Sequence, residues 1–207
     1  MYIPKEFLIS DRHVIIEFMR KNGFGLLVTN GEYPEASHIP MIVTEEEPLR
    51  VWGHLAVGNK QLNGLNGSRV LLIFGGPHAY ISPTWYAVPG QVPTWNYATV
   101  HAYGTARLSG RRETTEMLEK MVKFFEENSP LSGRMSERKY QDIMSGIVGF
   151  HVDVTSLEGK FKMSQNHSVE DRIGVVKHLR ISDDPYDREV AEMVRQTIPP
   201  DRINKDF

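Results

Sequence analysis

The chain has 207 residues, 40% of them hydrophobic, and carries 24 Lys and Arg against 26 Asp and Glu, a net charge of -2. A chain of this length buries roughly 70% of the surface that its unfolded form exposes, so we expect one domain over the whole chain. The balanced charge gives no general attraction to nucleic acid or anionic lipid. The absence of cysteine excludes disulfides, thiolate metal sites and a cysteine nucleophile.

Neither a targeting segment nor a membrane span is visible in the sequence. The N-terminal MYIPKEFLIS lacks the apolar run of a signal peptide. No later segment approaches the ~20 apolar residues that cross a bilayer. We therefore expect a cytoplasmic protein without a membrane partner, in agreement with the lack of cysteine.

The first half of the chain predicts one helix followed by strands. Residues 10–23 offer Ser10 as N-cap, then an apolar stripe, then Gly23 as a stop, which is typical of a short helix. The turn-rich segments GEYPE and EEEP separate the strands that follow, and such short connections favour antiparallel neighbours. Strands are expected at 24–30, 36–44, 49–56, 69–76 and 78–83.

The second half predicts a long bent strand and several helices. Residues 96–110 form one strand with Gly104 at the bend. About six or seven strands, rarely interrupted by helices, favour a closed small β-barrel over a doubly wound sheet. A helical C-terminal extension is expected from about residue 183, with Pro185 in its first turn. Helices are expected at 112–128, 136–146 and 184–198, and strands at 147–159 and 160–166.

The sequence carries no familiar catalytic or metal-binding signature. It has no Gly-x-Ser-x-Gly elbow, Walker loop, His-Glu-x-x-His or Gly-x-Gly-x-x-Gly. We therefore predict no catalytic residue and no metal site. The segment Gly75-Gly76-Pro77-His78 is expected to be a plain tight turn rather than an anion site. Four histidines fall on or near strands in a spacing that matches no ligand pattern, and we interpret them as structural: His38, His54, His78 and His101.

The segment GPHAYISPTWYAVPGQVPTWNY, residues 76–97, has an unusual composition for a connection. It contains Trp85 and Trp95, each preceded by Pro-Thr. A simple loop needs turn residues and stays solvated, whereas this one is rigid and aromatic. Two readings stay open for the tryptophans: they fill the ends of the barrel, or they lie at a seam between protomers, where aromatic anchors are favoured.

Several segments resemble one known family. PKEFLIS, SHIP, GHLAVGNKQ, GPHAYISPTWY, VPTWNYATVHAYG and GKFKMSQN follow one another over nearly the whole chain. In this order they resemble the PaiB-type family, described as FMN-binding negative transcriptional regulators. The resemblance implies a mainly β, antiparallel split β-barrel of the flavin-reductase and pyridoxamine-oxidase type with peripheral helices. It also implies a homodimer with its FMN sites at the subunit interface, and a role in repression.

The resemblance also implies where FMN binds. A basic turn entering a short helix holds the phosphate in such barrels, and here that segment is His54 to Gln61, with Lys60 and the helix N-terminus as positive groups. Val57-Gly58 replaces an arginine expected in this family, which favours weak FMN binding or none in the isolated protein. The residues predicted to bind the cofactor are Ser37, His38, His54, Asn59, Lys60, Gln61, His78, Trp85, Trp95 and Asn96.

Three hypotheses about function remain open at this point. The first is an FMN-binding regulator or flavin-linked sensor, the second an FMN-dependent oxidoreductase of the same fold, and the third a cofactor-free dimeric interaction protein. No DNA-reading motif is visible, so DNA or a protein partner would be engaged indirectly. Lys160 and Lys162 alternate with apolar residues, which predicts a solvated strand face, with a phosphate contact as the alternative.

Overall fold

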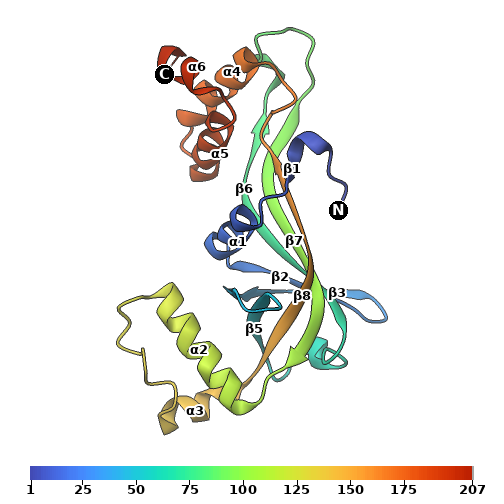
Figure 1. Ribbon diagram of the computed structural model, residues 1–207, viewed down its shortest axis with the longest axis vertical. Helices are drawn as coiled ribbons and strands as arrows, with labels where there is room; N and C mark the ends of the chain where they lie inside the picture. The colour runs from blue at the N-terminus through green and yellow to red at the C-terminus, as the bar shows by residue number, and fades with distance from the viewer. Residues whose placement is uncertain (207) are drawn as a thin grey trace. The chain divides into compact units, whose positions relative to one another are not determined.

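The computed structural model describes residues 1–206, the last three of them by backbone only (Figure 1). The strands are β1 (Leu8–Ile9), β2 (Phe24–Asn30), β3 (Pro34–Pro40), β4 (Ile42–Thr44), β5 (Arg50–Ala56), β6 (Arg69–Ile81), β7 (Thr94–Leu108) and β8 (Ile147–Lys162). The α-helices are α1 (Arg12–Lys21), α2 (Arg111–Phe125), α3 (Arg138–Met144), α4 (Val169–Arg180), α5 (Pro185–Arg195) and α6 (Pro200–Asp206). Short 3₁₀ turns are η1 (Lys5–Phe7), η2 (Lys60–Leu62) and η3 (Pro83–Trp85).

The described chain divides into two compact units. Unit 1 consists of Met1–Arg12, Gly75–Val100 and Glu158–Phe207, and unit 2 of His13–Phe74 and His101–Leu157. The long strands β6, β7 and β8 contribute residues to both units. Every helix among the described residues is too short or too polar to cross a membrane.

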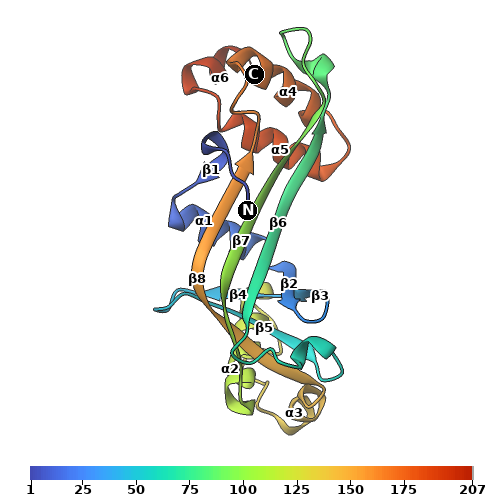
Figure 2. The same cartoon turned by 90° about the vertical axis from the view of Figure 1, so that its right-hand side faces the viewer.

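The strands form one sheet in the order β3-β2-β6-β7-β8-β5-β4, with β1 added beside β8. Figure 2 shows β6, β7 and β8 running side by side. The pairs with a defined register are antiparallel: β1–β8, β2–β3, β2–β6, β4–β5 and β5–β8. The strand expected at 36–44 is divided at Met41 into β3 and β4. The predicted antiparallel, mainly β architecture is confirmed.

Two predicted strand breaks are wrong, because β6 and β8 are each continuous. The pairing of β6 with β2 ends at Ile73. Beyond that point β6 leaves β2, and Pro77, which cannot donate a ladder hydrogen bond, is tolerated there. The segment Gly75 to His78 is therefore extended strand rather than a tight turn. Likewise β8 runs through Gly159 to Lys162, and joins the strands expected at 147–159 and 160–166.

The core of unit 2 lies between its strands and two helices. α1 begins at Arg12, shortly after the predicted cap Ser10, and buries Ile15, Phe18 and Met19 of the expected apolar stripe, together with Ile16; Val14, also expected in the stripe, is exposed. α2 packs on the sheet, where Met117 lies in one buried cluster with Ile42 and Trp52. At Gly104 on β7, an added Cβ would lie 2.3 Å from the carbonyl oxygen of Asp153, so the close approach of β8 requires glycine there.

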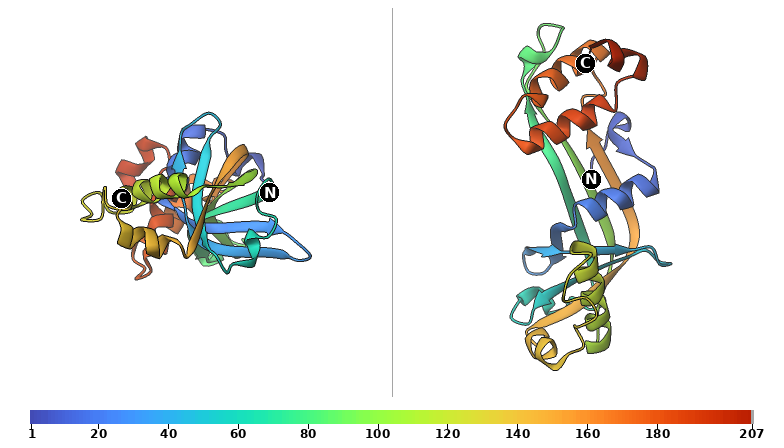
Figure 3. Two further views of the ribbon diagram at one scale, coloured as in Figure 1. Left: turned by 90° about the horizontal axis from the view of Figure 1, so that it is seen from below. Right: turned by 90° about the vertical axis from the view of Figure 1, so that its left-hand side faces the viewer.

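The C-terminal helices of unit 1 begin earlier than the sequence suggested. The predicted extension started near residue 183, whereas α4 already begins at Val169, with the Ser168 hydroxyl accepting a hydrogen bond from Asp171 N at 3.1 Å. α4 and α5 pack against each other, and the orange and red helices lie together in Figure 3. An added Cβ at Gly174 of α4 would lie 2.1 Å from the Trp85 carbonyl oxygen. α4 therefore packs directly on η3.

Candidate functional site

The residues predicted to bind the cofactor fall into two groups, one in each unit. Because the units are separate compact bodies, each group is described by itself. Unit 2 holds Ser37, His38, His54, Asn59, Lys60 and Gln61. Unit 1 holds His78, Trp85, Trp95 and Asn96.

Gln61 is the centre of a polar cluster in unit 2. Its side chain is 4% exposed, and Nε2 donates to Thr29 Oγ1 at 3.0 Å and to the carbonyl oxygens of Leu27 and Glu35. Its Oε1 accepts a hydrogen bond from the Ser37 hydroxyl, which also accepts from Asn59 Nδ2 at 3.0 Å. The hydrogen-bonding capacity of Gln61 is thus used within the protein. Gln61 positions Ser37 and, through it, Asn59.

Lys60 is the first residue of the short 3₁₀ helix η2. This helix spans Lys60–Leu62, and its Gln61 amide donates to Asn59 Oδ1 at 2.9 Å. Because a helix of three residues has only a small dipole, the Lys60 ammonium is the main positive group of this turn, and its contact with a phosphate stays a prediction. Lys60 borders a cavity of about 260 Å³ whose described lining also includes Glu35. Val57, in the expected arginine position, is 57% exposed.

The two histidines of this group lie on different strands. His54 is half-buried on β5 and shares a face with Trp52, because alternate residues of a strand point the same way. Its Nδ1 is buried, and no described residue hydrogen-bonds to it. Burial lowers the pKa of His54, so the ring is neutral near pH 7. His38 is exposed and stacks on Phe24 with ring centroids 6.0 Å apart, on the opposite face of β3 from Ser37.

In unit 1, His78 and Trp95 belong to a cluster of exposed rings with Tyr80 and Tyr186, here called the aromatic cluster. Trp95 is 54% exposed, and its ring centroid lies 5.9 Å from that of Tyr80 and 6.1 Å from that of His78. Tyr186, from α5, lies 5.1 Å from His78. Four aromatic rings at a surface, each free to contact a further flat or apolar group, are typical of an interaction site.

Trp85 and Asn96 are used inside unit 1. The Trp85 ring stacks on His178 of α4, with centroids 5.2 Å apart and an interplanar angle of 8°. Asn96 is 0% exposed, and its Nδ2 donates to the Ser164 hydroxyl at 2.9 Å. Trp85 thus anchors α4, whereas Trp95 remains at the surface. The doubled Pro-Thr-Trp motif gave no indication that its two tryptophans would differ.

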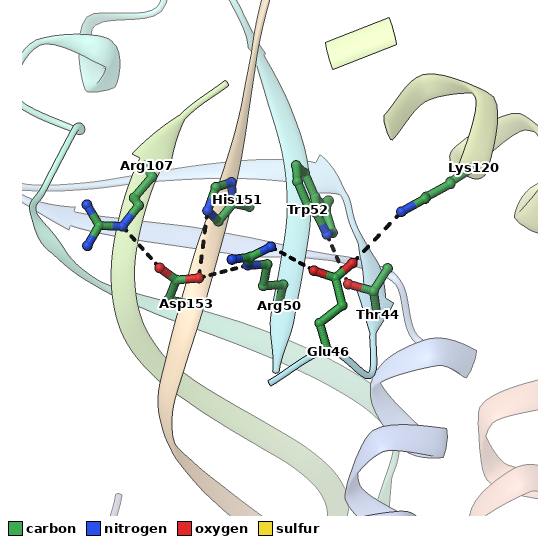
Figure 4. A network of polar contacts seen from close by, with 8 residues as sticks. All are labelled: Thr44, Glu46, Arg50, Trp52, Arg107, Lys120, His151 and Asp153. Carbon is green, nitrogen blue, oxygen red and sulfur yellow. Dashed lines mark hydrogen bonds and ion pairs between the residues drawn. The ribbon is translucent and has the colours of Figure 1, made fainter. Parts of the chain in front are cut away.

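Sequence reasoning missed a charged network in unit 2 (Figure 4). Asp153 accepts hydrogen bonds from Arg50 Nε and Arg107 Nε, both at 3.0 Å, and lies 3.7 Å from His151 Nε2. Burial opposes ionisation of Asp153, but the two arginines outweigh it and lower its pKa. Burial also lowers the pKa of His151. Arg50 and Asp153 stand directly opposite each other in the β5–β8 register, so the signal becomes visible only once the strands are paired.

The histidines that the sequence placed near strands do not form a metal centre. In the part of the chain that the structure describes, no group of three or more His, Asp or Glu side chains is arranged to hold a metal ion. His54, His78 and His38 have the surroundings given above, and the His101 ring lies 6.3 Å from that of Tyr103.

Comparison with solved structures defines the fold class. A flavocytochrome, Anf3 from Azotobacter vinelandii, superimposes with a TM-score of 0.62 over 77% of this chain and 72% of its own, at 12% identity. The FAD and heme binding protein from Mycobacterium smegmatis gives 0.61 over 75% of this chain and 73% of its own, at 12% identity. The fold is therefore that of the split β-barrels found in flavin-binding proteins.

Comparison of sequences defines the family. The family described as "Putative FMN-binding domain" matches residues 1–156. The Bacillus subtilis protein named "Protease synthase and sporulation protein PAI 2" is 34% identical over 96% of this chain and 98% of its own length. An uncharacterized protein of Emericella nidulans, AN0679, is 28% identical over 95% and 97%. The chain belongs to this PaiB-type family, and its cofactor is FMN.

The residues of unit 2 fit the polar half of FMN. Asn59 and Ser37 offer amide and hydroxyl groups suited to the ribityl chain, and Lys60 offers a cation for the phosphate. His54 Nδ1 lacks a hydrogen-bond partner among the described residues but is buried, and the described lining of the cavity beside Lys60 does not include His54. Because Glu35 lines the same cavity as Lys60, a phosphate meets little net positive charge there.

Proposed function

We propose that this protein is a flavin-linked negative regulator of transcription that works as a homodimer. The observation that carries the proposal is the similarity over 96% of the chain to a protein named for protease synthesis and sporulation. That relative's name links it to sporulation, a process in which gene expression changes. The FMN-binding domain supplies the ligand to which such a regulator would respond.

In this proposal FMN is held weakly, as a signal and not as a permanent group. Lys60 is exposed and shares its cavity with Glu35, so the charge available to a phosphate is small and screened. Ser37 and Asn59 orient the ribityl chain. Weak binding lets occupancy follow the concentration of free FMN.

The aromatic cluster is the surface we propose for a second copy of this chain. Trp95, Tyr80 and Tyr186 are each about half exposed, and Trp95 is the residue type most enriched at interface hot spots. The cluster spans β6, β7 and α5 of unit 1, so a partner would contact several elements at once. Trp95 also stays among the residues that we predict to bind the cofactor; a contact with the flavin ring means that its loss weakens FMN and riboflavin binding alike.

The proposal places DNA contact outside the isolated chain. With balanced charge, duplex DNA should bind weakly, without sequence preference, and the complex should dissociate as salt rises. Electrophoretic mobility shifts at increasing salt measure this. Tight, sequence-selective binding at physiological salt would show that the chain reads DNA directly.

The experiment that tests the function follows bound flavin during exposure to NADH and NADPH. The FMN-loaded protein is mixed with either nucleotide without oxygen, and an electron acceptor is then added. A regulator shows at most one slow reduction of its flavin, whereas repeated turnover of the acceptor would identify an FMN-dependent oxidoreductase. If the protein takes up no flavin, the cofactor-free interaction protein, favoured by the exposed Val57, replaces the proposal.

A further inference from the structure

The loop rich in tryptophan and the segment after β8 enclose a polar cavity in unit 1. Its volume is about 220 Å³, below the 300–1,000 Å³ that is usual for drug-sized ligands. The cavity therefore suits a small molecule or a single functional group. Its polar lining includes the side chains of Gln91, Thr94, Asn96, Lys162, Ser164 and Asn166.

Lys162 gives this cavity its positive charge. The Lys162 side chain is half-buried, and its Nζ donates a hydrogen bond to Thr94 Oγ1. Lys160, two residues earlier on β8, is 9% exposed, and its Nζ donates to the Tyr2 carbonyl oxygen at 3.2 Å and lies 5.2 Å from the centre of the Tyr97 ring. The predicted solvated strand face is therefore wrong. Burial, and then the charge of Lys160, lower the pKa of Lys162.

The hydrogen-bond partners that the structure gives these two lysines are uncharged. Among the described residues, no Asp or Glu forms an ion pair with Lys160 or Lys162. Asp171 lies near the cavity wall, with Oδ2 3.8 Å from His167 Nδ1. Its Oδ1 accepts hydrogen bonds from the backbone amides of Ala87 at 2.8 Å and Val88 at 3.3 Å. An anion in the cavity would therefore meet an uncompensated cation.

The backbone beside Lys162 is held in a strained conformation. Ser164 has φ 58°, and within the described chain it is the non-glycine residue with a positive φ. Its hydroxyl accepts from Asn96 Nδ2 at 2.9 Å, and its carbonyl oxygen accepts from His167 N at 3.0 Å. The His167 ring in turn stacks on Tyr86 at 4.5 Å. Strain fixed by buried contacts of this kind is typical of binding sites.

We propose that this cavity is an effector site that binds the carboxylate or phosphate group of a small metabolite, with Lys162 as its charged partner. Amide and hydroxyl groups from Gln91, Asn166 and Thr94 complete the set of donors that an oxyanion needs. Lys162, Ser164, Asn166 and His167 lie outside the segment matched by the FMN-binding family, whereas Gln91, Thr94 and Asn96 lie within it, so a competition experiment has to separate this site from the proposed FMN site.

The test uses inorganic phosphate and acetate as separate probes. Each is titrated into the full-length protein while the side-chain amide signals of Asn96 and Asn166 are followed by NMR. We expect saturable shifts with a Kd of about 1 mM or tighter for at least one probe. A preference for phosphate assigns a phosphorylated ligand, and a preference for acetate assigns a carboxylate. Lack of saturable shifts with both probes would overturn the proposal.

Variants separate a charged contact from damage to the fold. Lys162→Met should weaken probe binding by roughly tenfold or more, and Lys162→Arg should retain most of it. Lys177→Met, which removes an exposed lysine of α4, is the matched control and should leave binding unchanged. If Lys162→Met fails to fold, Thr94→Val removes a donor with little change of shape and should also weaken binding. An equal loss in Lys177→Met contradicts the assignment.

Competition with flavin distinguishes this site from the proposed FMN site. Saturating FMN should leave the bound probe in place. Displacement of the probe by FMN, but not by riboflavin, would show that the flavin phosphate binds in this cavity. That result would overturn the proposal of a separate effector site. Failure of FMN to bind at all leaves the expected probe titration unchanged, so the two proposals fail independently.

Discussion

Neighbouring side chains of one turn have different uses in this protein. Asn59, Lys60 and Gln61 all have the chemistry that FMN needs, and the sequence indicates all three. In the fold, Gln61 is buried and engaged by β2 and β3, whereas Lys60 remains exposed. Residues far away in the sequence, such as Thr29, decide which of these side chains forms hydrogen bonds inside the protein. The residue types of the turn alone do not determine this.

Lys60→Ala tests the phosphate contact. An exposed lysine makes a screened contact, so we expect FMN affinity to fall by about tenfold, the low end for a charge-assisted hydrogen bond. Riboflavin, which lacks the phosphate, should bind as before. Lys123→Ala on α2 changes the charge equally and serves as control. Flavin fluorescence titration of both ligands measures the contrast, and an unchanged FMN affinity would show that Lys60 does not contact the phosphate.

Because of Asp153, we predict that the unfolding free energy of the protein decreases at acid pH. Its pKa is lowered in the folded state from the ordinary 3.8. The stability it contributes is fully present above that pH and is lost as the pH falls through the lower folded pKa. Asp153→Asn should therefore flatten the loss of unfolding free energy in that window and cost about 1 kcal/mol at pH 7.

Urea unfolding at a series of pH values measures this effect. Asp142→Asn, at an exposed position of α3, should retain the wild-type pH dependence. If Asp153→Asn also keeps the wild-type slope in acid, the ion pairs with Arg50 and Arg107 do not stabilise the fold.

Helices and strands with one clear apolar periodicity were predicted well from the sequence. Those with mixed patterns were not. β2 spans the predicted 24–30, and α2 begins one residue and ends three residues before its predicted bounds, because each shows one regular apolar pattern. α4 was missed because its buried residues, which include Asp171 as well as Val175, do not form one apolar stripe. The break predicted in β6 was based on Gly and Pro, which often mark turns. These residues are also tolerated inside a strand where one of its sides has no neighbouring strand, as in this part of β6.

Gly174→Ala tests the packing of α4 on η3. In a solvated helix this change stabilises by up to ~1 kcal/mol. Here the added Cβ would lie 2.1 Å from the Trp85 carbonyl oxygen, so we expect a net loss of roughly 1–3 kcal/mol. Gly75→Ala, whose added Cβ meets no atom within 4 Å, is the control. Chemical unfolding compares them, and a stabilised Gly174→Ala would contradict the close contact.

At the scale of the whole molecule, resemblance of sequence segments predicted the fold class and the cofactor, and both are confirmed. The site is less predictable, because proximity is set by folding. The predicted set divides between a polar cluster in unit 2 and the aromatic cluster in unit 1. The cavity around Lys162 is lined by part of a segment for which the alternation of polar and apolar residues had predicted a solvated strand face.

The homodimer gives a prediction for the aromatic cluster. We expect a dimeric mass at micromolar concentration in light scattering, and a monomer for Trp95→Glu, which places a charge among apolar rings. Ile143→Glu alters another exposed apolar residue, on α3 of unit 2, and should stay dimeric. A monomeric wild-type protein would remove the proposed interface.

The most direct test of FMN binding is an equilibrium titration of the purified wild-type chain with FMN, followed by flavin fluorescence and absorbance. We predict saturable binding of one FMN per chain, with a shifted flavin spectrum and an affinity that falls as salt screens Lys60. A flavin signal that stays identical to that of free FMN at every protein concentration would contradict it.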